Sequence, residues 1–112
     1  MSTAQLHFLK AHGTGNDFVV IDAVTRDIGI SQQQVIALCD RNAGIGADGL
    51  LRVARAAEFG VVDAQFFMDY RNADGSLAET CGNGLRVFAR YLVENQLESP
   101  GRFSIGTRAG TV

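Results

Sequence analysis

Cys81 is the residue whose type and position most favour chemistry, because it precedes a predicted helix in the glycine-rich run ETCGNGLRVF, residues 79–88. A thiol at a helix N-terminus faces backbone N–H groups without helical partners and the positive end of the helix dipole. Both stabilise a thiolate and lower the thiol pKa below about 8.5. The alternative is that Cys81 is a small buried hydrophobic residue, as free cysteines usually are. The local sequence leaves both interpretations open.

The same helix start predicts an anion-binding site beside the thiol. Gly82 and Gly84 leave backbone N–H groups accessible, so that these groups can bind a carboxylate or a phosphate. A base next to an anion site suits proton removal from a carbon that carries a carboxylate. Cys39 differs, because it follows three apolar residues within a predicted helix, and we expect it to be packed in the core.

Two asparagines in glycine-containing turns are further candidates. Asn16 lies in the turn HGTGND, residues 12–17, and Asn72 lies in the turn RNADGS, residues 71–76. An asparagine in a turn usually hydrogen-bonds its own backbone or adopts a positive φ angle, and this is the stronger interpretation. The functional interpretation is contact with a polar substrate, since an amide group both donates and accepts hydrogen bonds.

Other polar motifs have simpler explanations. The run Gly44–Gly49 matches G-x-G-x-x-G, but a dinucleotide site needs a strand before it and a helix after it, and here the order is reversed. We expect a tight helix-to-strand connection instead. His7 and His12 have no metal-ligand spacing and are expected to be structural, so no metal site is predicted. Charges at Asp40–Arg41 and Asp69–Arg71 are expected to be solvated or locally paired at the surface.

Hydrophobic periodicity predicts a mixed α+β chain, with strands at residues 5–11, 18–22, 50–54, 65–70 and 102–106. A helix is predicted to follow the N-cap Ser31 and to end near Asn42, with one apolar side formed by Val35, Ile36, Leu38 and Cys39. A second helix at residues 82–95 is apolar over more than one stripe, so we expect it to be largely enclosed. The turn at residues 72–75 is expected to close a hairpin. A further strand is expected to start after Gly110, so the chain has the pattern of one that is cut.

Size and composition are ordinary for a soluble globular protein. The 112 residues form one domain or part of one, long enough to bury a core. A net charge of −2 gives no indication of a nucleic-acid or membrane partner, and no apolar run approaches the roughly 20 residues of a membrane span. The N-terminus lacks a secretory pattern, and two cysteines do not indicate a disulfide framework, so a cytoplasmic location is expected.

Four motifs, in order and with consistent spacing, resemble a known family. They are HGTGNDF at residues 12–18, GIGADG at 44–49, FMDYRNADGS at 67–76 and CGNG at 81–84. With these blocks the chain closely resembles the N-terminal half of diaminopimelate epimerases, PLP-independent amino-acid epimerases of lysine and peptidoglycan biosynthesis. The resemblance runs from about Leu6 to the end of the chain.

The resemblance implies a fold of two similar halves, each a β-barrel-like sheet wrapped around a central helix, with the active site between the halves. Residues 1–112 would form the N-terminal domain, and the helix at residues 82–95 would be its central helix. The implied partners are diaminopimelate as substrate, the C-terminal half of the same enzyme and a second copy in a homodimer. No cofactor is implied.

The resemblance also assigns roles to the candidate residues. It implies that Cys81 is one of two catalytic cysteines and that the backbone of Gly82 and Asn83 binds the substrate α-carboxylate. It implies that Asn16 and Asn72 contact the substrate. The second cysteine of the family has no place in this chain, so we expect the chain to be inactive alone.

Departures from the family pattern and other function classes define the alternatives. Many members carry a glutamine where this chain has Gly49, so that substrate contact is not carried over. Proline racemase and its relatives share the architecture but typically have histidine in place of Asn83, which disfavours that isomerase group. A non-catalytic binding or assembly half-domain is a second class. A redox thiol protein is a third, and the absence of a nearby resolving cysteine in the sequence argues against it.

Overall fold

The computed structural model describes residues 8–13, 15–24, 29–79 and 82–112. The predicted strand residues Gln5–His7 lie outside these ranges. Each predicted helix and strand has a counterpart, although the strand expected from residue 102 begins only at Ile105. The elements are β1 (Phe8–His12), β2 (Asp17–Asp22), α1 (Gln32–Cys39), β3 (Gly49–Arg55), the 3-10 helix η1 (Ala56–Phe59), β4 (Phe66–Asn72), α2 (Gly82–Glu94), β5 (Ile105–Thr107) and β6 (Gly110–Thr111).

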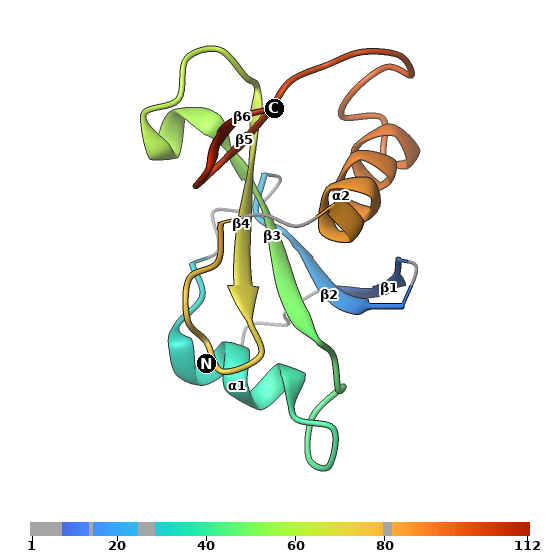
Figure 1. The fold of residues 1–112 in the computed structure, drawn as a ribbon, viewed down its shortest axis with the longest axis vertical. Helices are drawn as coiled ribbons and strands as arrows, with labels where there is room; N and C mark the ends of the chain where they lie inside the picture. Colours follow the sequence, from blue (N-terminus) through green and yellow to red (C-terminus); the bar gives the residue numbers. More distant parts are fainter. Residues whose placement is uncertain (1–7, 14, 25–28, 80–81) are drawn as a thin grey trace.

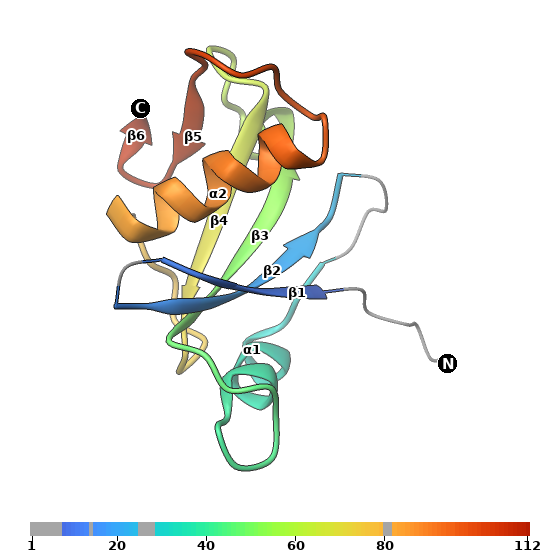
Figure 2. The ribbon, with the colours of Figure 1, turned by 90° about the vertical axis from the view of Figure 1, so that its right-hand side faces the viewer.

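The strands form one mixed sheet in the order β1-β2-β3-β4-β5-β6. Three neighbouring pairs are antiparallel, whereas β2–β3 and β4–β5 are parallel and are joined by α1 and α2, the long connections that parallel pairing requires. The sheet is strongly twisted, so that β1 and β2 cross the direction of β3 and β4 (Figures 1 and 2). Within the described ranges, β1 and β6 are its edges. The predicted α+β class is confirmed, whereas wrapping of a barrel-like sheet around a helix is not.

Helix α2 packs on one face of the sheet because apolar side chains alternate along the strands. Its residues Val87, Phe88 and Leu92 contact a core of strand side chains that point to this face: Phe18, Val20, Leu51, Val53, Phe66, Met68 and Ile105. The opposite side of α2 exposes Arg86 and Arg90. The predicted enclosure of this helix therefore holds only for the side that faces the sheet.

Helix α1 covers the other face, at the end of the sheet where β3 begins and β4 ends (Figure 1). Val35 and Cys39 are buried there with strand and loop residues Val19, Ile21, Ala47 and Leu50. The prediction that Cys39 is a packing residue is confirmed, and burial raises the pKa of its thiol. Ile36, predicted on the same apolar side, is 39% exposed.

Local hydrogen bonds set both ends of α1. The Ser31 hydroxyl accepts a bond from the N–H of Gln34 over 3.2 Å, and the Gln34 side chain accepts one from the N–H of Ser31 over 2.8 Å. This reciprocal capping box confirms the predicted N-cap. The helix ends at Cys39, before the predicted Asn42, because the Asp40 carboxylate accepts a bond from the N–H of Asn42 over 2.8 Å.

The two predicted connections around β3 and β4 are confirmed. The glycine-rich run at residues 44–49 leads from α1 into β3, the order opposite to that of a dinucleotide site. Gly44 is required there, since a Cβ would lie 2.0 Å from the carbonyl oxygen of Ala37. The turn after β4 closes a short hairpin, in which Arg71 and Leu77 form an antiparallel bridge.

Within the described ranges, neither helix is long and apolar enough to cross a membrane.

Candidate active site

The first turn of α2 lies against the turn between β1 and β2. The Nδ2 of Asn83 donates a hydrogen bond to the Oδ1 of Asn16 over 2.7 Å. Gly13 permits this approach, since a Cβ at that position would lie only 3.2 Å from the Cβ of Asn83. Two predicted substrate contacts, Asn16 and Asn83, are thus brought together, with Gly82 beside them as the first residue of α2.

A chain of hydrogen bonds continues from this asparagine pair in both directions. The Nδ2 of Asn16 donates to Asp48 Oδ2 over 3.4 Å, and the same oxygen accepts a bond from the N–H of Asp17 over 3.0 Å. On the other side, the Arg86 guanidinium donates to the Oδ1 of Asn83. A carboxylate and a guanidinium therefore orient the two amide groups from opposite ends. Asp48 was not among the predicted site residues, although its place in the motif GIGADG, two residues before a predicted strand, was a usable signal.

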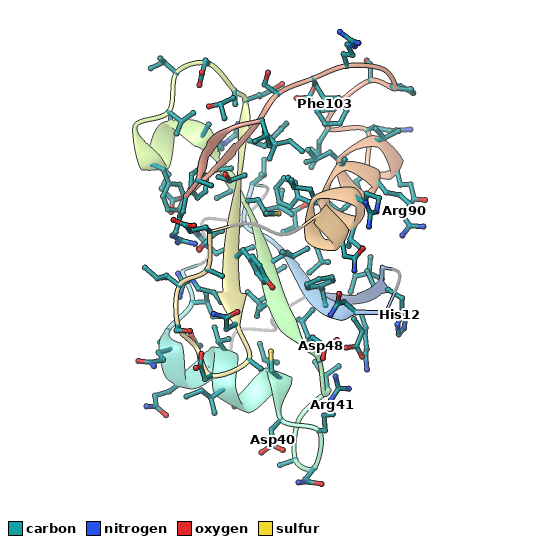
Figure 3. The ribbon with its side chains drawn as sticks, in the orientation of Figure 1. His12, Asp40, Arg41, Asp48, Arg90 and Phe103 are labelled. Atoms are coloured by element: carbon teal, nitrogen blue, oxygen red, sulfur yellow. The ribbon has the colours of Figure 1, made fainter. Side chains whose placement is uncertain are left out.

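Asp17, the first residue of β2, is the centre of a cluster of charges at the same turn. Its carboxylate oxygens lie 3.2 Å from Lys10 Nζ and 3.0 Å from Arg41 Nη2. The hydrogen bonds from Arg41 outweigh burial and lower the pKa of Asp17 well below its ordinary range. Arg41 also lies 3.0 Å from Asp48, and in Figure 3 these two side chains point toward each other while Asp40 lies apart. Arg41, expected to be solvated or locally paired, is 56% exposed, and it pairs with Asp17 and Asp48 rather than with its neighbour Asp40.

Two open cavities flank the turn between β1 and β2. One, of about 420 Å³, is lined by the turn itself together with Arg41 and Asp48. The other, of about 470 Å³, is lined by His12, Gly13, Arg86 and Arg90. The two guanidinium groups suit an anionic ligand. His12 ends β1, one residue beyond the predicted strand, and it is exposed and lines both cavities.

The part of the chain that the structure describes contains no group of three or more His, Cys, Asp or Glu residues arranged to hold a metal ion.

Asn72 lies at the same end of the sheet but has local partners. It is the last residue of β4 and is in register with Gly49 of β3, which is itself in register with Phe18 of β2. The Nδ2 of Asn72 donates to the hydroxyl of Ser76 over 2.9 Å. The amide nitrogen is therefore bonded within its own turn, as the simpler interpretation predicted, and the implied substrate contact of Asn72 stays a prediction. Gly49 has no room for a side chain, because a Cβ would lie 2.9 Å from the carbonyl oxygen of Arg71.

The turn that carries Asn72 rests on the first turn of α1. The Nε2 of Gln32 donates a hydrogen bond to the carbonyl oxygen of Asp74 over 3.3 Å. Gly75 has a φ of 85°, and a Cβ there would lie 2.3 Å from the Cγ of Gln32. Position 75 therefore requires glycine for its backbone conformation and for space.

The predicted catalytic residue Cys81 lies outside the described residues. Its assigned role stays a prediction. The described chain includes Glu79 before it and Gly82 after it, and Gly82 is exposed at the start of α2.

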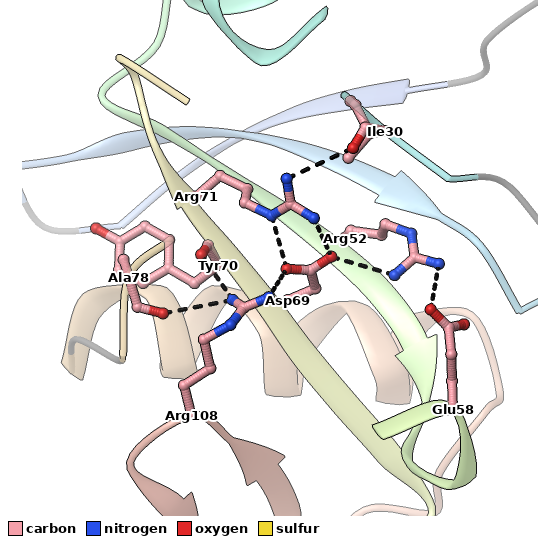
Figure 4. Close-up of polar contacts among 8 residues, drawn as sticks. All are labelled: Ile30, Arg52, Glu58, Asp69, Tyr70, Arg71, Ala78 and Arg108. Atoms are coloured by element: carbon pink, nitrogen blue, oxygen red, sulfur yellow. Dashed lines mark hydrogen bonds and ion pairs between the residues drawn. The ribbon is translucent and has the colours of Figure 1, made fainter. Parts of the chain in front are cut away.

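Asp69, expected at the surface, is 0% exposed and bonded by Arg52, Arg71 and Arg108 (Figure 4). The surface prediction is wrong because β3 and β4 are buried on both faces, so a charge in the middle of β4 must be compensated within the protein. A usable signal was present in the sequence. Arg71 follows Asp69 by two residues on the same face of the sheet, and Arg52 is the cross-strand partner of Asp69.

Comparison with known proteins places the chain in a family. The family model of diaminopimelate epimerase matches residues 8–112. A diaminopimelate epimerase from Rhodococcus erythropolis is 52% identical over 96% of this chain, and one from Corynebacterium glutamicum is 54% identical over 92%. The chain spans 40% and 38% of the length of these two relatives.

A more distant likeness concerns the fold alone. The crystal structure of a PhzF-family phenazine biosynthesis protein from Bacillus anthracis superposes with a TM-score of 0.62 at 22% identity, over 95% of this chain and 33% of that chain. The matched motifs, the paired asparagines at the start of α2 and the close relatives agree: this chain belongs to the diaminopimelate epimerase family.

Proposed function

We propose that this chain supplies one side of the active site of an enzyme that interconverts LL- and meso-diaminopimelate without a PLP cofactor. In this proposal Cys81 is one of two bases, and the second cysteine comes from a C-terminal half with a similar fold that closes the active site. Close relatives at 52% and 54% identity bear the name diaminopimelate epimerase, and this supports the proposal. The chain alone is then expected to have little or no epimerase activity.

The observation that carries the proposal is the hydrogen bond between Asn16 and Asn83 at the start of α2. It joins two segments, 67 residues apart in the sequence, that both carry family motifs. The N–H groups of the first turn of a helix have no helical acceptors and can bind a carboxylate. In the proposed complex, Gly82 and Asn83 bind the substrate α-carboxylate, while Asn16 and Asn72 contact the rest of the amino acid.

The proposed reaction moves two protons at one carbon. A thiolate removes the Cα proton on one face, so that a C–H bond breaks and an S–H bond forms. A thiol on the opposite face returns a proton, so that its S–H bond breaks and a new C–H bond forms with inverted configuration. Backbone N–H groups at the carboxylate stabilise the negative charge that develops there, because they are already oriented.

A chimera tests the proposal. Residues 1–112 replace the matching segment of the Rhodococcus erythropolis relative, and exchange of the substrate Cα hydrogen for solvent deuterium is followed by NMR. We expect exchange by the chimera and little by the 112-residue chain alone. Cys81→Ala should reduce the exchange rate about 10²–10⁴-fold, the usual contribution of a positioned acid or base.

Cys39→Ala is the matched control, since Cys39 is packed in the buried cluster under α1 and lines neither cavity at the proposed site, so its loss should leave the exchange rate nearly unchanged. Exchange at the parental rate by the Cys81→Ala chimera would contradict the proposal. So would wild-type-like turnover by the isolated chain.

A second candidate function is non-catalytic assembly, favoured by one surface feature. An apolar groove of about 640 Å³ runs between α2 and the segment before β5, lined by Leu85, Ala89, Phe103 and Ile105 together with neighbouring residues. Figure 3 shows Phe103 on the segment that connects α2 to β5. Exposed apolar surface of this kind promotes association. Sedimentation velocity should then show concentration-dependent self-association that Phe103→Asp removes. A clean monomer with no ligand-induced stabilisation would argue against it.

A further inference from the structure

Four side chains from three segments form one line of hydrogen bonds across the candidate site. The Arg86 guanidinium donates to Oδ1 of Asn83. The Nδ2 of Asn83 donates to Oδ1 of Asn16 over 2.7 Å, and the Nδ2 of Asn16 donates to Oδ2 of Asp48 over 3.4 Å. The line begins at a cation on α2 and ends at an anion directly before β3. We call these four side chains the amide relay.

The two ends of the relay determine which way each amide group points. A carboxylate only accepts hydrogen bonds, so Asp48 must meet the NH2 group of Asn16. The oxygen of Asn16 then faces Asn83 and needs a donor, which is the NH2 group of Asn83. A guanidinium only donates, so Arg86 must meet the oxygen of Asn83. Either end is enough to orient both amide groups, and the two ends require the same orientation.

The Asp48 end of the relay is held by its neighbours. The N–H of Asp17 donates to Asp48 Oδ2 over 3.0 Å, and the N–H of Asp48 donates to the carbonyl oxygen of Asp17 over 3.0 Å. The Nη2 of Arg41 donates to the other carboxylate oxygen, Oδ1, over 3.0 Å. Asp48 therefore keeps its place although it is an exposed residue.

The Arg86 end lies within α2. Asn83 and Arg86 are three residues apart, so their side chains share one face of the helix. The guanidinium lies close to the start of the helix, since a Cβ built at Gly82 would be 3.7 Å from Nη1 of Arg86. Such a pair usually contributes little to the stability of a helix. This pair differs because Asn83 continues the line of hydrogen bonds to Asn16.

We propose that Arg86 is a positioning residue of the active site, which acts through Asn83 to keep the NH2 group of Asn16 on the side of Asp48. The relay uses one N–H of that group. The second N–H can donate to a carboxylate oxygen of the substrate in the cavity of about 420 Å³ that Asn16 and Asp48 line. This substrate contact rests on the proposed function. Because Arg86 and Asp48 set the same orientation, loss of one end leaves the other in control.

The first test follows the effect of Arg86 on Asn16 without enzyme activity. The asparagines of the 112-residue chain are labelled with ¹⁵N, and their side-chain NH2 signals are recorded by NMR. Arg86→Gln replaces a side chain that only donates with one that donates or accepts, so it should shift the signals of Asn83 and, through it, of Asn16. Arg86→Lys, which again only donates, should restore the Asn16 signals. The signals of Asn72, whose NH2 group is bonded to Ser76, are the reference.

Arg90→Gln is the matched control. Arg90 lines the same cavity as Arg86, but its guanidinium donates to the carbonyl oxygen of His12 over 3.2 Å. Its loss removes one positive charge from the same side of α2 and should leave the Asn16 signals nearly unchanged. An equal shift of Asn16 in Arg90→Gln, or unchanged Asn16 signals in folded Arg86→Gln, would overturn the inference.

The second test is a double-mutant cycle on the chimera, in which isothermal titration calorimetry measures the Kd of LL-diaminopimelate. Asp48→Asn should weaken binding about fivefold and Arg86→Gln about twofold, since each leaves one end of the relay intact. With an amide at both ends the orientation is no longer set, so the double variant should bind more than about threefold more weakly than the product of the single effects. Asp48→Ser is the second variant, for use if Asp48→Asn does not fold, because a hydroxyl also donates or accepts.

Independent sites give effects that multiply in Kd. Binding by the double variant within about threefold of the product, or tighter than the product, would therefore overturn the inference. The cycle between Asp48→Asn and Arg90→Gln is the control and should give the product. Arg86→Lys combined with Asp48→Asn should bind like Asp48→Asn alone, since a lysine still meets the oxygen of Asn83 as a donor.

The two tests separate the inference from the proposed function. A chimera that does not bind LL-diaminopimelate, although Arg86 still shifts the Asn16 signals, would refute the proposed function alone. A chimera that binds, with independent effects at Arg86 and Asp48, would refute the positioning role alone.

Discussion

Asp69 and Asp17 are two carboxylates with the same kind of partners in different surroundings. Asp69 has three arginines and a side chain that is 0% exposed. Asp17 has a lysine and an arginine and a side chain that is 14% exposed, beside an Arg41 that is 56% exposed. One cluster lies inside the sheet, and the other lies at the edge of an open cavity.

The difference teaches that ion pairs of similar geometry serve different purposes. A buried carboxylate that loses a partner leaves an uncompensated charge, so the cluster around Asp69 must form as a whole. Water and salt reach the Asp17 cluster, so its pairs contribute little to stability and remain open to competition from a ligand. We therefore assign Asp69 to holding the chain in place and Asp17 to the electrostatics of the candidate site.

The largest expected effect is on folding stability. Asp69→Asn removes the charge that three guanidinium groups face, and we expect a loss of about 3–5 kcal/mol of unfolding free energy. Asp17→Asn should lose on the order of 1 kcal/mol or less, since its partners are more exposed. Urea denaturation followed by circular dichroism measures both. Equal losses would remove the distinction between the clusters.

Lowering the pH should test how both carboxylates contribute to stability. The pKa of Asp69 is lower in the folded chain than its ordinary value of about 3.9, so its stabilisation is complete above that value and is lost as the pH falls through the folded-state pKa. Unfolding free energy of the wild type should therefore fall steeply below about pH 4. Asp69→Asn should show a shallower decline, measured by urea titrations between pH 2 and pH 6.

Asp17→Asn should also make the decline shallower, because the pKa of Asp17 is lowered in the folded chain too. A decline in Asp69→Asn as steep as in the wild type would show that this carboxylate contributes nothing to acid sensitivity.

A smaller effect is expected on ligand binding. Asp48→Asn removes the carboxylate that orients Asn16, and we expect about fivefold weaker binding of LL-diaminopimelate to the chimera, the equivalent of about one hydrogen bond. Isothermal titration calorimetry measures the affinity. Asp40→Asn is the control, since its carboxylate bonds the N–H groups of its own turn. If both variants bind like the parent, Asp48 has no part in the site.

Salt should produce the smallest difference. The stability difference between wild type and Arg41→Gln should shrink as NaCl rises from 0.05 M to 1 M, because exposed charges are screened over about 3 Å at 1 M. The difference between wild type and Arg52→Gln should persist, since the Arg52 side chain is 5% exposed. Thermal unfolding at each salt concentration provides the comparison. Persistence of the Arg41 difference would mean that this pair is shielded from solvent.

Local elements were predictable because their signals lie within a few residues. Ser31 and Gln34 form a capping box that can be read directly from the sequence, and the apolar run at β2 forms a buried strand as expected. Family motifs named Asn16 and Asn83 as candidate site residues, whereas their direct hydrogen bond depends on packing between distant segments.

The remaining features depend on which faces of the sheet are covered. Asp69 is buried because α1, residue Ile30 and the β5–β6 turn lie over its face. The spacing of Asp69 and Arg71 indicates that the charge is paired, but it does not show which elements cover that face. Arg41 pairs with Asp17, 24 residues away, rather than with its neighbour Asp40. This pairing also depends on contacts between distant segments, which the local sequence does not show. The outer side of α2 is exposed because the described sheet covers only its inner side.

The turn that carries Asn72 packs tightly against the start of α1, through the close approach of Gly75 to Gln32. Gln32 and Asp74, which are 42 residues apart in the sequence, are also joined by a hydrogen bond, so the turn and the helix are expected to move together. A displacement of this helix, by a substitution on its surface or by a protein docked against it, would be transmitted to the amide of Asn72. The conformation of the turn at Asn72 thus depends on α1, which packs on the opposite face of the sheet from α2.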